Sequence, residues 1–185
     1  MVAIKTVNLT KKYKDTVAVD NLNLQIEQGT LFALLGVNGA GKTTTVKMLS
    51  CLTKPTSGDA FVDTYSIKDR AADVKQIIGV LPQETAVAPK LSVKENLEFM
   101  CGIYGFSKDK RKAKTIELAE QFGLQNILNK KAGKLSGGMQ RRLSIAMALI
   151  SEPSILFLDE PTLGLDVIAR SELWDTIRAL KGKVT

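Results

Sequence analysis

The chain has 185 residues, 44% of them hydrophobic, which suits a single domain with a substantial core. No apolar run approaches the roughly 18 residues that a membrane span requires, and the start of the chain lacks a signal-peptide core, so we expect a cytosolic protein. Histidine is absent and Cys51 and Cys101 form no CxxC pair, which excludes a histidine base and a zinc site. The net charge of +7 includes a basic run at 108–114, which fits a solvated helix face or a contact with acidic lipid or nucleic acid.

The first third of the chain predicts antiparallel strands that lead into a parallel α/β core. Val2–Val7 has the composition of a strand, and Leu22–Ile26 alternates apolar with polar residues as a half-exposed strand does. A turn at Gln28-Gly29 then leads into an apolar strand, Leu31–Leu35. A helix is expected from about Gly41 to Cys51.

The rest of the chain alternates between short apolar runs and helical patterns. The expected elements are strands at 60–62 and 78–81 around a helix at 71–77, a helix from the capping box Ser92–Glu95 to Tyr104, a helix at 108–122, a buried strand at 155–158, and a last helix that Asp166 caps and that ends near Leu180.

A glycine-rich loop, GVNGAGKTT at residues 36–44, follows the expected strand Leu31–Leu35. Glycines let backbone N–H groups approach a ligand closely, and a helix N-terminus favours phosphate. Lys42 can reach β- and γ-phosphates, and the Thr43 hydroxyl can coordinate Mg²⁺. The spacing is that of a P-loop, so we expect phosphate binding here, and a plain glycine-rich turn is the alternative.

A pair of carboxylates, Asp159 and Glu160, ends the apolar strand at 155–158. In α/β sheets, ligands bind at the carboxyl ends of parallel strands. One carboxylate can hold Mg²⁺ through water, and the other can orient or deprotonate an attacking water. The alternative is an acidic helix start.

A second phosphate-binding surface is predicted at the Ser-Gly-Gly of LSGGMQRR (residues 135–142), because these three residues enter a helix. One chain then carries one P-loop and one surplus phosphate surface. Two chains that face each other resolve this surplus, because each surface can complete the other chain's site.

These motifs resemble those of the nucleotide-binding domains of ATP-binding cassette (ABC) transporters. In that family's terms, the glycine loop is similar to Walker A, ILFLDE to Walker B, LSGGMQ to the signature, VLPQE at 80–84 to the Q-loop and PTLGLD at 161–166 to the D-loop. The resemblance covers nearly the whole chain. It implies a single domain over residues 1–185, with an α/β P-loop NTPase core, an N-terminal antiparallel β subdomain and an inserted helical subdomain at about 86–150.

The resemblance also implies roles for individual residues. Tyr13 would stack on adenine, Asp159 would position Mg²⁺ together with Thr43 and Gln83, and Glu160 would be the catalytic carboxylate assisted by Gln83. Phosphates would be held by Gly36, Asn38, Gly39, Ala40, Gly41, Lys42, Thr43 and Thr44. The trans signature and the dimer seam would consist of Ser136, Gly137, Gly138, Gln140 and Asp166.

The implied function is ATP hydrolysis with Mg²⁺, in an ATP-dependent homodimer or paired cassette that drives export through a separate membrane permease. The protein would then be peripheral on the inner face of the cell membrane. The alternatives are a soluble cassette acting on ribosomes or nucleic acid, although we do not expect a nucleic-acid partner, and a copy that binds nucleotide without turnover.

The resemblance finally implies a further strand between Leu31–Leu35 and the strand at 155–158, ending in a switch histidine. Neither that strand nor a histidine occurs up to Thr185. We therefore expect the family domain to lack its C-terminal part after Thr185, the natural protein to continue beyond that residue, and turnover by these 185 residues to be poor.

Overall fold

The computed structural model describes residues 1–84 and 86–185, which form two compact units. The first unit contains residues 1–78, 154–157 and 180–185, and the second contains residues 79–153 and 158–179. The predicted helical region at about 86–150 lies in the second unit. None of the helices formed by the described residues is both long and apolar enough to cross a membrane.

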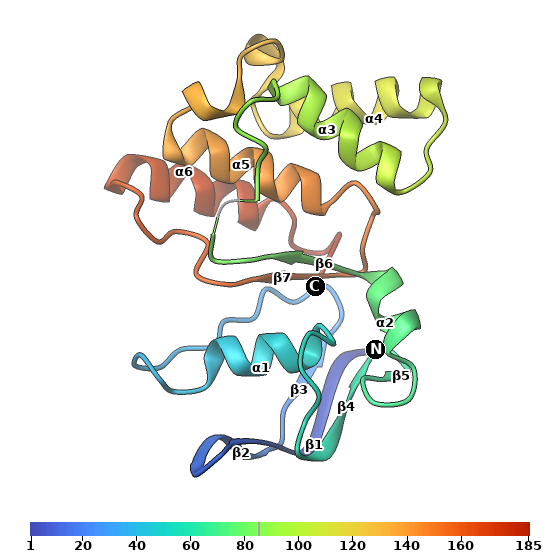
Figure 1. Ribbon diagram of the computed structural model, residues 1–185, viewed down its shortest axis with the longest axis vertical. Coiled ribbons are helices and arrows are strands. Elements are labelled where there is room, and N and C mark those ends of the chain that lie inside the picture. The colour runs from blue at the N-terminus through green and yellow to red at the C-terminus, as the bar shows by residue number, and fades with distance from the viewer. Residues whose placement is uncertain (85) are drawn as a thin grey trace. The chain divides into compact units, whose positions relative to one another are not determined.

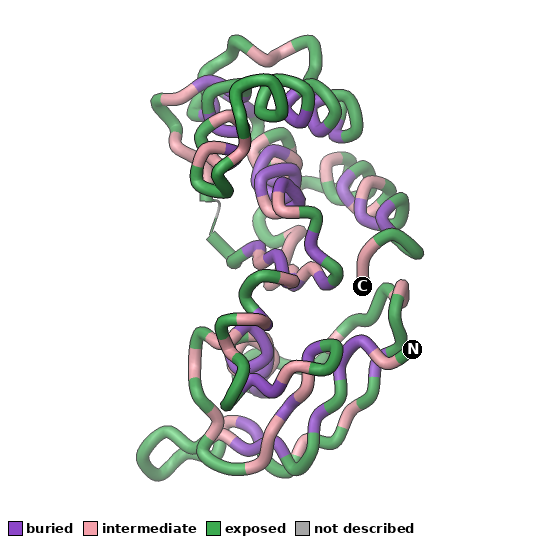
Figure 2. Tube along the Cα trace, turned by 90° about the vertical axis from the view of Figure 1, so that its right-hand side faces the viewer, coloured by how far each residue is buried: buried purple, intermediate pink, exposed green. Residues whose placement is uncertain are grey.

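An antiparallel sheet dominates the first unit (Figure 1). Its strands are β1 (Val2–Tyr13), β2 (Thr16–Leu22), β3 (Gln25–Glu27), β4 (Ser57–Val62) and β5 (Tyr65–Ser66). Their order is β2-β1-β4-β5, with β3 also paired to β1. Figure 2 shows buried residues interspersed with exposed ones along these strands, as expected for a sheet with one covered face. The predicted antiparallel opening of the chain is therefore confirmed.

The strand expected at Leu22–Ile26 is wrong in its extent, because two strands replace it. β2 ends at Leu22 and β3 begins at Gln25, both paired with β1. The buried Thr6 accounts for the break, since its hydroxyl donates to the Leu22 carbonyl and accepts from the Leu24 amide, at 2.8 Å each. A side chain thus occupies the backbone groups that would have continued the ladder.

The strand expected at Leu31–Leu35 is also wrong, since residues 30–37 belong to no helix or strand. A strand exists only through ladder bonds to a neighbour, and the sheet of the first unit pairs β1 to β5 without this segment. The segment is correspondingly open, with Leu35 91% exposed and Phe32 44% exposed. The apolar side chains of this segment are therefore largely exposed instead of buried in a sheet.

Two further strands, β6 (Ile78–Leu81) and β7 (Ile155–Leu158), form a separate small sheet. The Ser154 amide donates to the Ile77 carbonyl at 2.9 Å, and the Asp159 amide donates to the Leu81 carbonyl at 3.0 Å. Partners advance in the same direction along both strands, so the pairing is parallel, as the apolar sequence of β7 predicted.

The end of the chain lies beside β7 in the first unit. The Leu156 amide donates to the Thr185 carbonyl at 2.7 Å, and the Thr185 amide donates to the Ser154 carbonyl at 3.1 Å. The Thr185 hydroxyl also accepts from the Gly29 amide at 2.8 Å. Thr185 therefore bonds to β7 and to the residue that precedes the open segment.

Helices build the second unit, and two short helices belong to the first. The first unit holds α1 (Lys42–Leu49) and α2 (Ala71–Ile77), and the second holds α3 (Val93–Ile103), α4 (Lys108–Gln121), α5 (Gly137–Ala148), α6 (Val167–Arg178) and the short 3₁₀ turns Gln125–Ile127 and Ala132–Lys134. In the second unit, α5 and α6 run side by side, and α3 packs on both α4 and α5 (Figure 1). The predicted caps are confirmed, since Ser92 and Glu95 form a capping box and the Asp166 carboxylate accepts from the Ala169 amide.

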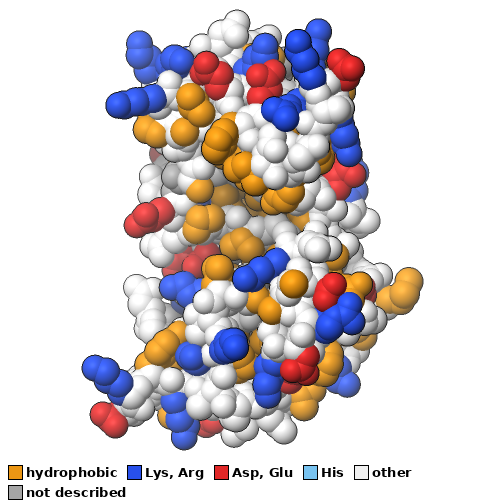
Figure 3. All heavy atoms as spheres, turned by 45° about the vertical axis from the view of Figure 1, so that its right-hand side comes forward, with side chains coloured by type: hydrophobic (Ala, Val, Ile, Leu, Met, Phe, Trp, Pro, Cys, Tyr) orange, Lys and Arg blue, Asp and Glu red, His pale blue; other side chains and the backbone are white. Residues whose placement is uncertain are grey.

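The basic run on α4 is solvated, with one exception. Lys114 is 7% exposed, and its ammonium donates to Glu117 at 2.8 Å and to Glu152 at 2.7 Å. A buried ammonium requires such partners, so Lys114 corrects the expectation of a uniformly solvated face. Figure 3 shows Lys and Arg side chains mixed with acidic ones over the end formed by α3 and α4, rather than a patch of one sign.

Candidate functional site

The glycine-rich loop of the first unit lies exposed at the start of α1. Residues 36–40 are all exposed, and a turn closed by the Ala40 amide and the Val37 carbonyl, at 3.1 Å, shapes them. Helix α1 has no side-chain cap and no acidic residue in its first turn. The start of a helix, with its unpaired N–H groups and positive dipole end, favours phosphate, and here neither the N-cap side chain nor an acidic residue of the helix's own first turn opposes it.

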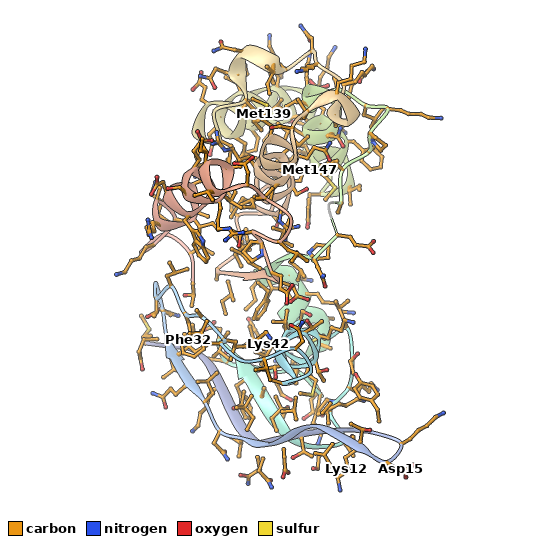
Figure 4. The ribbon with its side chains drawn as sticks, turned by 90° about the vertical axis from the view of Figure 1, so that its left-hand side faces the viewer. Lys12, Asp15, Phe32, Lys42, Met139 and Met147 are labelled. Carbon is orange, nitrogen blue, oxygen red and sulfur yellow. The ribbon has the colours of Figure 1, made fainter. Side chains whose placement is uncertain are left out.

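Lys42, the first residue of α1, bends back over this loop (Figure 4). Its ammonium donates to the carbonyls of Gly36, at 2.7 Å, and Val37, at 3.0 Å. The charge is thereby held at the loop itself, and a phosphate group can replace the carbonyls as a stronger, charge-assisted acceptor.

Two glycines of the loop have a backbone conformation that disfavours side chains, with φ of 85° at Gly39 and 83° at Gly41. They differ in the space around them. A Cβ at Gly41 would lie 2.3 Å from the Ala18 carbonyl oxygen, whereas a Cβ at Gly39 would meet nothing within 4 Å. Gly41 is thus required for the packing of α1 on β2, and Gly39 for the shape of the open loop.

In the second unit, the end of β7 and the loop after β6 bring the predicted hydrolytic residues together. Asp159 and Glu160 are half-buried, and Gln83 is exposed. Glu160 has a φ of 46°, which is uncommon for a residue with a side chain, and its carbonyl accepts from the Leu163 amide at 3.1 Å. Backbone strain of this kind is found where a fold fixes a functional side chain.

The arrangement around Glu160 depends on Arg141, to which the sequence analysis gave no role. Its guanidinium is buried and donates to backbone carbonyls on both loops. The acceptors are Pro161 (2.8 Å from Nε), Pro82 and Gln83 (2.9 and 3.1 Å from Nη1), and Asp159 and Glu160 (3.1 and 3.3 Å from Nη2). Burial lowers the pKa of Arg141, and the charge of the Asp159 carboxylate acts in the opposite direction.

A signal for Arg141 exists in the sequence. Ser144 and Ile145, which follow it by three and four residues, are both buried on the same face of α5. An arginine on the core face of a helix requires several acceptors, and that requirement could have marked it.

The predicted signature residues begin α5 in the second unit. Ser136 is the N-cap, and its hydroxyl accepts from the Met139 amide at 3.4 Å. A Cβ at Gly137 or Gly138 would meet Leu165 at 3.4 Å or Ala169 at 3.0 Å. The small residues thus let the start of α5 approach Leu165 and the first turn of α6.

The three remaining predicted positions are Gln140, Asp166 and Tyr13. The side-chain amide of Gln140 donates to the Leu135 carbonyl at 3.2 Å, and Asp166 caps α6. Tyr13 is 45% exposed at the end of β1, with the Lys11 ammonium 5.0 Å from its ring centroid. Its neighbours Lys12 and Asp15 mark the tip of the β1–β2 hairpin, apart from Lys42 (Figure 4).

The predicted metal ligands are divided between the units, with Thr43 in the first and Gln83 and Asp159 in the second. All three offer the oxygen donors that Mg²⁺ prefers. Within residues 1–84 and 86–185, no group of three or more His, Cys, Asp or Glu side chains could hold a metal ion by itself.

A lysine-bearing glycine loop at a helix N-terminus and a strand that ends in carboxylates are the parts of a P-loop nucleotide-binding protein. The chain belongs to the ABC transporter family, whose model matches residues 19–163. The resemblance stated from the motifs is confirmed.

Curated relatives carry names from drug resistance and export. The chain is 39% identical over 180 residues to a probable multidrug ABC transporter ATP-binding protein of Escherichia coli, covering 97% of this chain and 31% of the relative. It is 41% identical to a daunorubicin resistance ATP-binding protein of Streptomyces coeruleorubidus (97% and 57% covered), and 41% identical to a Nod factor export ATP-binding protein of Burkholderia orbicola (94% and 57% covered). The chain thus spans a third to somewhat over half of these proteins.

Solved structures confirm the fold class. The structure of cbiO1 from Clostridium perfringens, described as part of the ABC transporter complex cbiONQ, matches with a TM-score of 0.90 at 28% identity, over 99% of this chain and 75% of that chain. The ATP-binding cassette MJ0796, in a dimeric post-hydrolysis state with ADP and Pi, matches with a TM-score of 0.83 at 30% identity, over 97% and 83%. The chain therefore has the α/β P-loop fold of these cassettes.

Proposed function

We propose that this protein is the ATP-binding and ATP-hydrolysing subunit of an ABC transporter that energises export through a separate membrane permease. The observation that carries the proposal is the open glycine loop, with Lys42 held over it at the uncapped start of α1. The names of the relatives, which refer to drug resistance and Nod factor export, support the direction of transport.

In this proposal the phosphates of ATP bind to the N–H groups of the glycine loop and to the Lys42 ammonium. Thr43, Gln83 and Asp159 would hold Mg²⁺, which would neutralise charge on the phosphates. Glu160 orients a water molecule and accepts its proton while the water oxygen attacks the γ-phosphorus. The bond from the γ-phosphorus to the bridging oxygen breaks, and ADP and inorganic phosphate leave.

The proposal also includes a head-to-tail dimer in which Ser136, Gly137 and Gly138 contact the γ-phosphate bound by a second chain. The Ser136 hydroxyl accepts one bond as an N-cap and keeps its own proton to donate to a phosphate oxygen. Apolar side chains next to Asp166 provide surface for such a seam, with Leu163 60%, Val167 81% and Ile168 73% exposed. The dimeric state of the MJ0796 cassette supports the same arrangement.

The permease, the peripheral membrane location and the adenine contact of Tyr13 are parts of the same proposal. The Tyr13 ring is exposed enough to stack on a base, with the Lys11 ammonium near it. The mixture of charges over α3 and α4 favours a protein partner over nucleic acid, which binds to basic patches (Figure 3).

Phosphate release from Mg·ATP tests the proposal. The protein at its natural length should hydrolyse ATP, Lys42→Ala should lose most of its ATP affinity and with it phosphate release, and Glu160→Gln should bind ATP without turnover. Co-purification with membranes that contain the permease should accompany activity. ATP turnover unaffected by Glu160→Gln would contradict the catalytic assignment, and recovery with ribosomes instead of membranes would favour the soluble alternative.

A further inference from the structure

Arg141 is a buried charged side chain that is held in place by hydrogen bonds to backbone carbonyls. It lies on the second turn of α5 and is 4% exposed. Its hydrogen bonds all go to backbone carbonyls. Burying a cation without such acceptors is costly, so the surrounding loops are shaped to supply them.

The bonds of Arg141 use its full donor capacity. A guanidinium has five N–H groups in a rigid plane, one on Nε and two on each Nη. Here Nε donates to one carbonyl, Nη1 to two and Nη2 to two. Lysine has three donors on one atom and a different shape, so it cannot make the same set of bonds.

The acceptors fall into two segments that are far apart in the sequence and adjacent in the second unit. Nη1 reaches the loop after β6 at Gln83, and Nη2 reaches the end of β7 at Glu160. Glu160 is the residue that the proposed function assigns to the attacking water, and the family resemblance implies that Gln83 assists it. One planar group therefore sets the spacing between their backbones.

We propose that Arg141 is a positioning residue for ATP hydrolysis, which holds Gln83 and Glu160 in register and links both to the start of α5. The inference rests on the proposed function and adds a residue to it. Ser136 caps the same helix a little more than one turn before Arg141. A phosphate that contacts the start of α5 would thus act, through one rigid helix, on the catalytic carboxylate of the same chain.

Arg142 provides a matched control on the same helix. It forms an ion pair with Glu172, a side chain that is 55% exposed. Arg141→Lys and Arg142→Lys therefore make the same chemical change, and only the first alters contacts to the two loops.

The experiment compares the steady-state kinetics of these two variants with wild type, at the protein's natural length. Arg141→Lys should lower kcat for Mg·ATP by roughly 10- to 100-fold, as small misplacements of catalytic groups do, while KM stays within about threefold. Arg142→Lys should keep both constants near those of wild type. Amide hydrogen exchange should be faster in Arg141→Lys at 83–84 and within 159–163, with the unfolding midpoint little changed.

Two results would overturn the inference. One is an Arg141→Lys protein with wild-type kcat and unchanged exchange in both segments. The other is loss of folding in both Arg141→Lys and Arg141→Gln, which would make the arginine a structural residue. Turnover by the wild-type protein is measured in parallel. If wild type itself does not hydrolyse ATP, the proposed function is wrong; if wild type hydrolyses ATP and the results above are found, only the role of Arg141 is wrong.

Discussion

Replacing Gly41 with alanine should destabilise the first unit much more than the same change at Gly39. Both glycines have φ near 84° in the same loop, at 83° and 85°. Alanine in this left-handed region costs about 1–2 kcal/mol at either position. Only at Gly41 would the new Cβ also overlap a backbone oxygen, 2.3 Å away on Ala18, and approach Val19 to 3.0 Å.

This overlap sets how much more unfolding free energy Gly41→Ala loses than Gly39→Ala. Forced overpacking of one methyl group typically costs about 1–3 kcal/mol, because the backbone on both sides must move. Gly41→Ala should therefore lose about 2–5 kcal/mol in total, and Gly39→Ala about 1–2 kcal/mol. With a urea dependence of about 2 kcal/mol per molar, the two midpoints should differ by about 0.5–1.5 M.

Urea unfolding followed by circular dichroism, without nucleotide, measures both variants against wild type. Equal midpoints for the two variants would refute the reasoning, because they would show that backbone conformation alone sets the cost. A Gly41→Ala protein as stable as wild type would refute the close contact between the loop and β2 altogether.

Three further predictions concern separate sites. Lys42→Ala should weaken Mg·ATP binding by about 10- to 100-fold, the value of a charge-assisted bond, and calorimetry that shows unchanged affinity would sink the phosphate-loop assignment. Asn96→Ala should lower the free energy of unfolding by about 2–4 kcal/mol, because the buried side-chain amide accepts from the Ala88 amide and donates to the Ala88 carbonyl, and the variant leaves both backbone groups unpaired. A loss smaller than the error of a urea titration would contradict this. The pKa of Glu95 is lowered from 4.5 to about 2 by the amide of its N-cap residue and by Lys131, so its contribution to stability is complete above pH 4.5 and is lost as pH falls towards 2. The melting temperature of Glu95→Gln should therefore fall less than that of wild type between pH 4.5 and pH 2. Melting temperatures that fall in parallel would count against the capping box.

The contiguous motifs could be predicted from the sequence because each one is a local arrangement. The loop at 36–44, the Ser136 cap and the carboxylates after β7 lie where short-range rules put them. Turn geometry, helix capping and apolar runs depend on residues within a few positions of one another.

The parts that could not be predicted depend on contacts between distant segments. Leu31–Leu35 has a strand's composition but lacks a ladder partner in the part of the chain that the structure describes. Arg141 bonds to carbonyls at Pro82 and Pro161, which are 59 and 20 residues away. The composition of a segment and the spacing of its hydrophobic residues carry no information about such distant partners. The positioning role proposed for Arg141 therefore emerges only from the fold.

The most direct test of the shared ATP site is the oligomeric state of Glu160→Gln, measured by size exclusion with light scattering. With saturating Mg·ATP this variant should be a dimer, and without nucleotide a monomer, because the γ-phosphate that joins two chains is not removed. Adding Ser136→Arg should leave ATP binding intact and keep the protein monomeric, since the larger side chain occupies the space for the partner's phosphate. A monomer at saturating Mg·ATP, or a dimer that tolerates Ser136→Arg, would contradict the account.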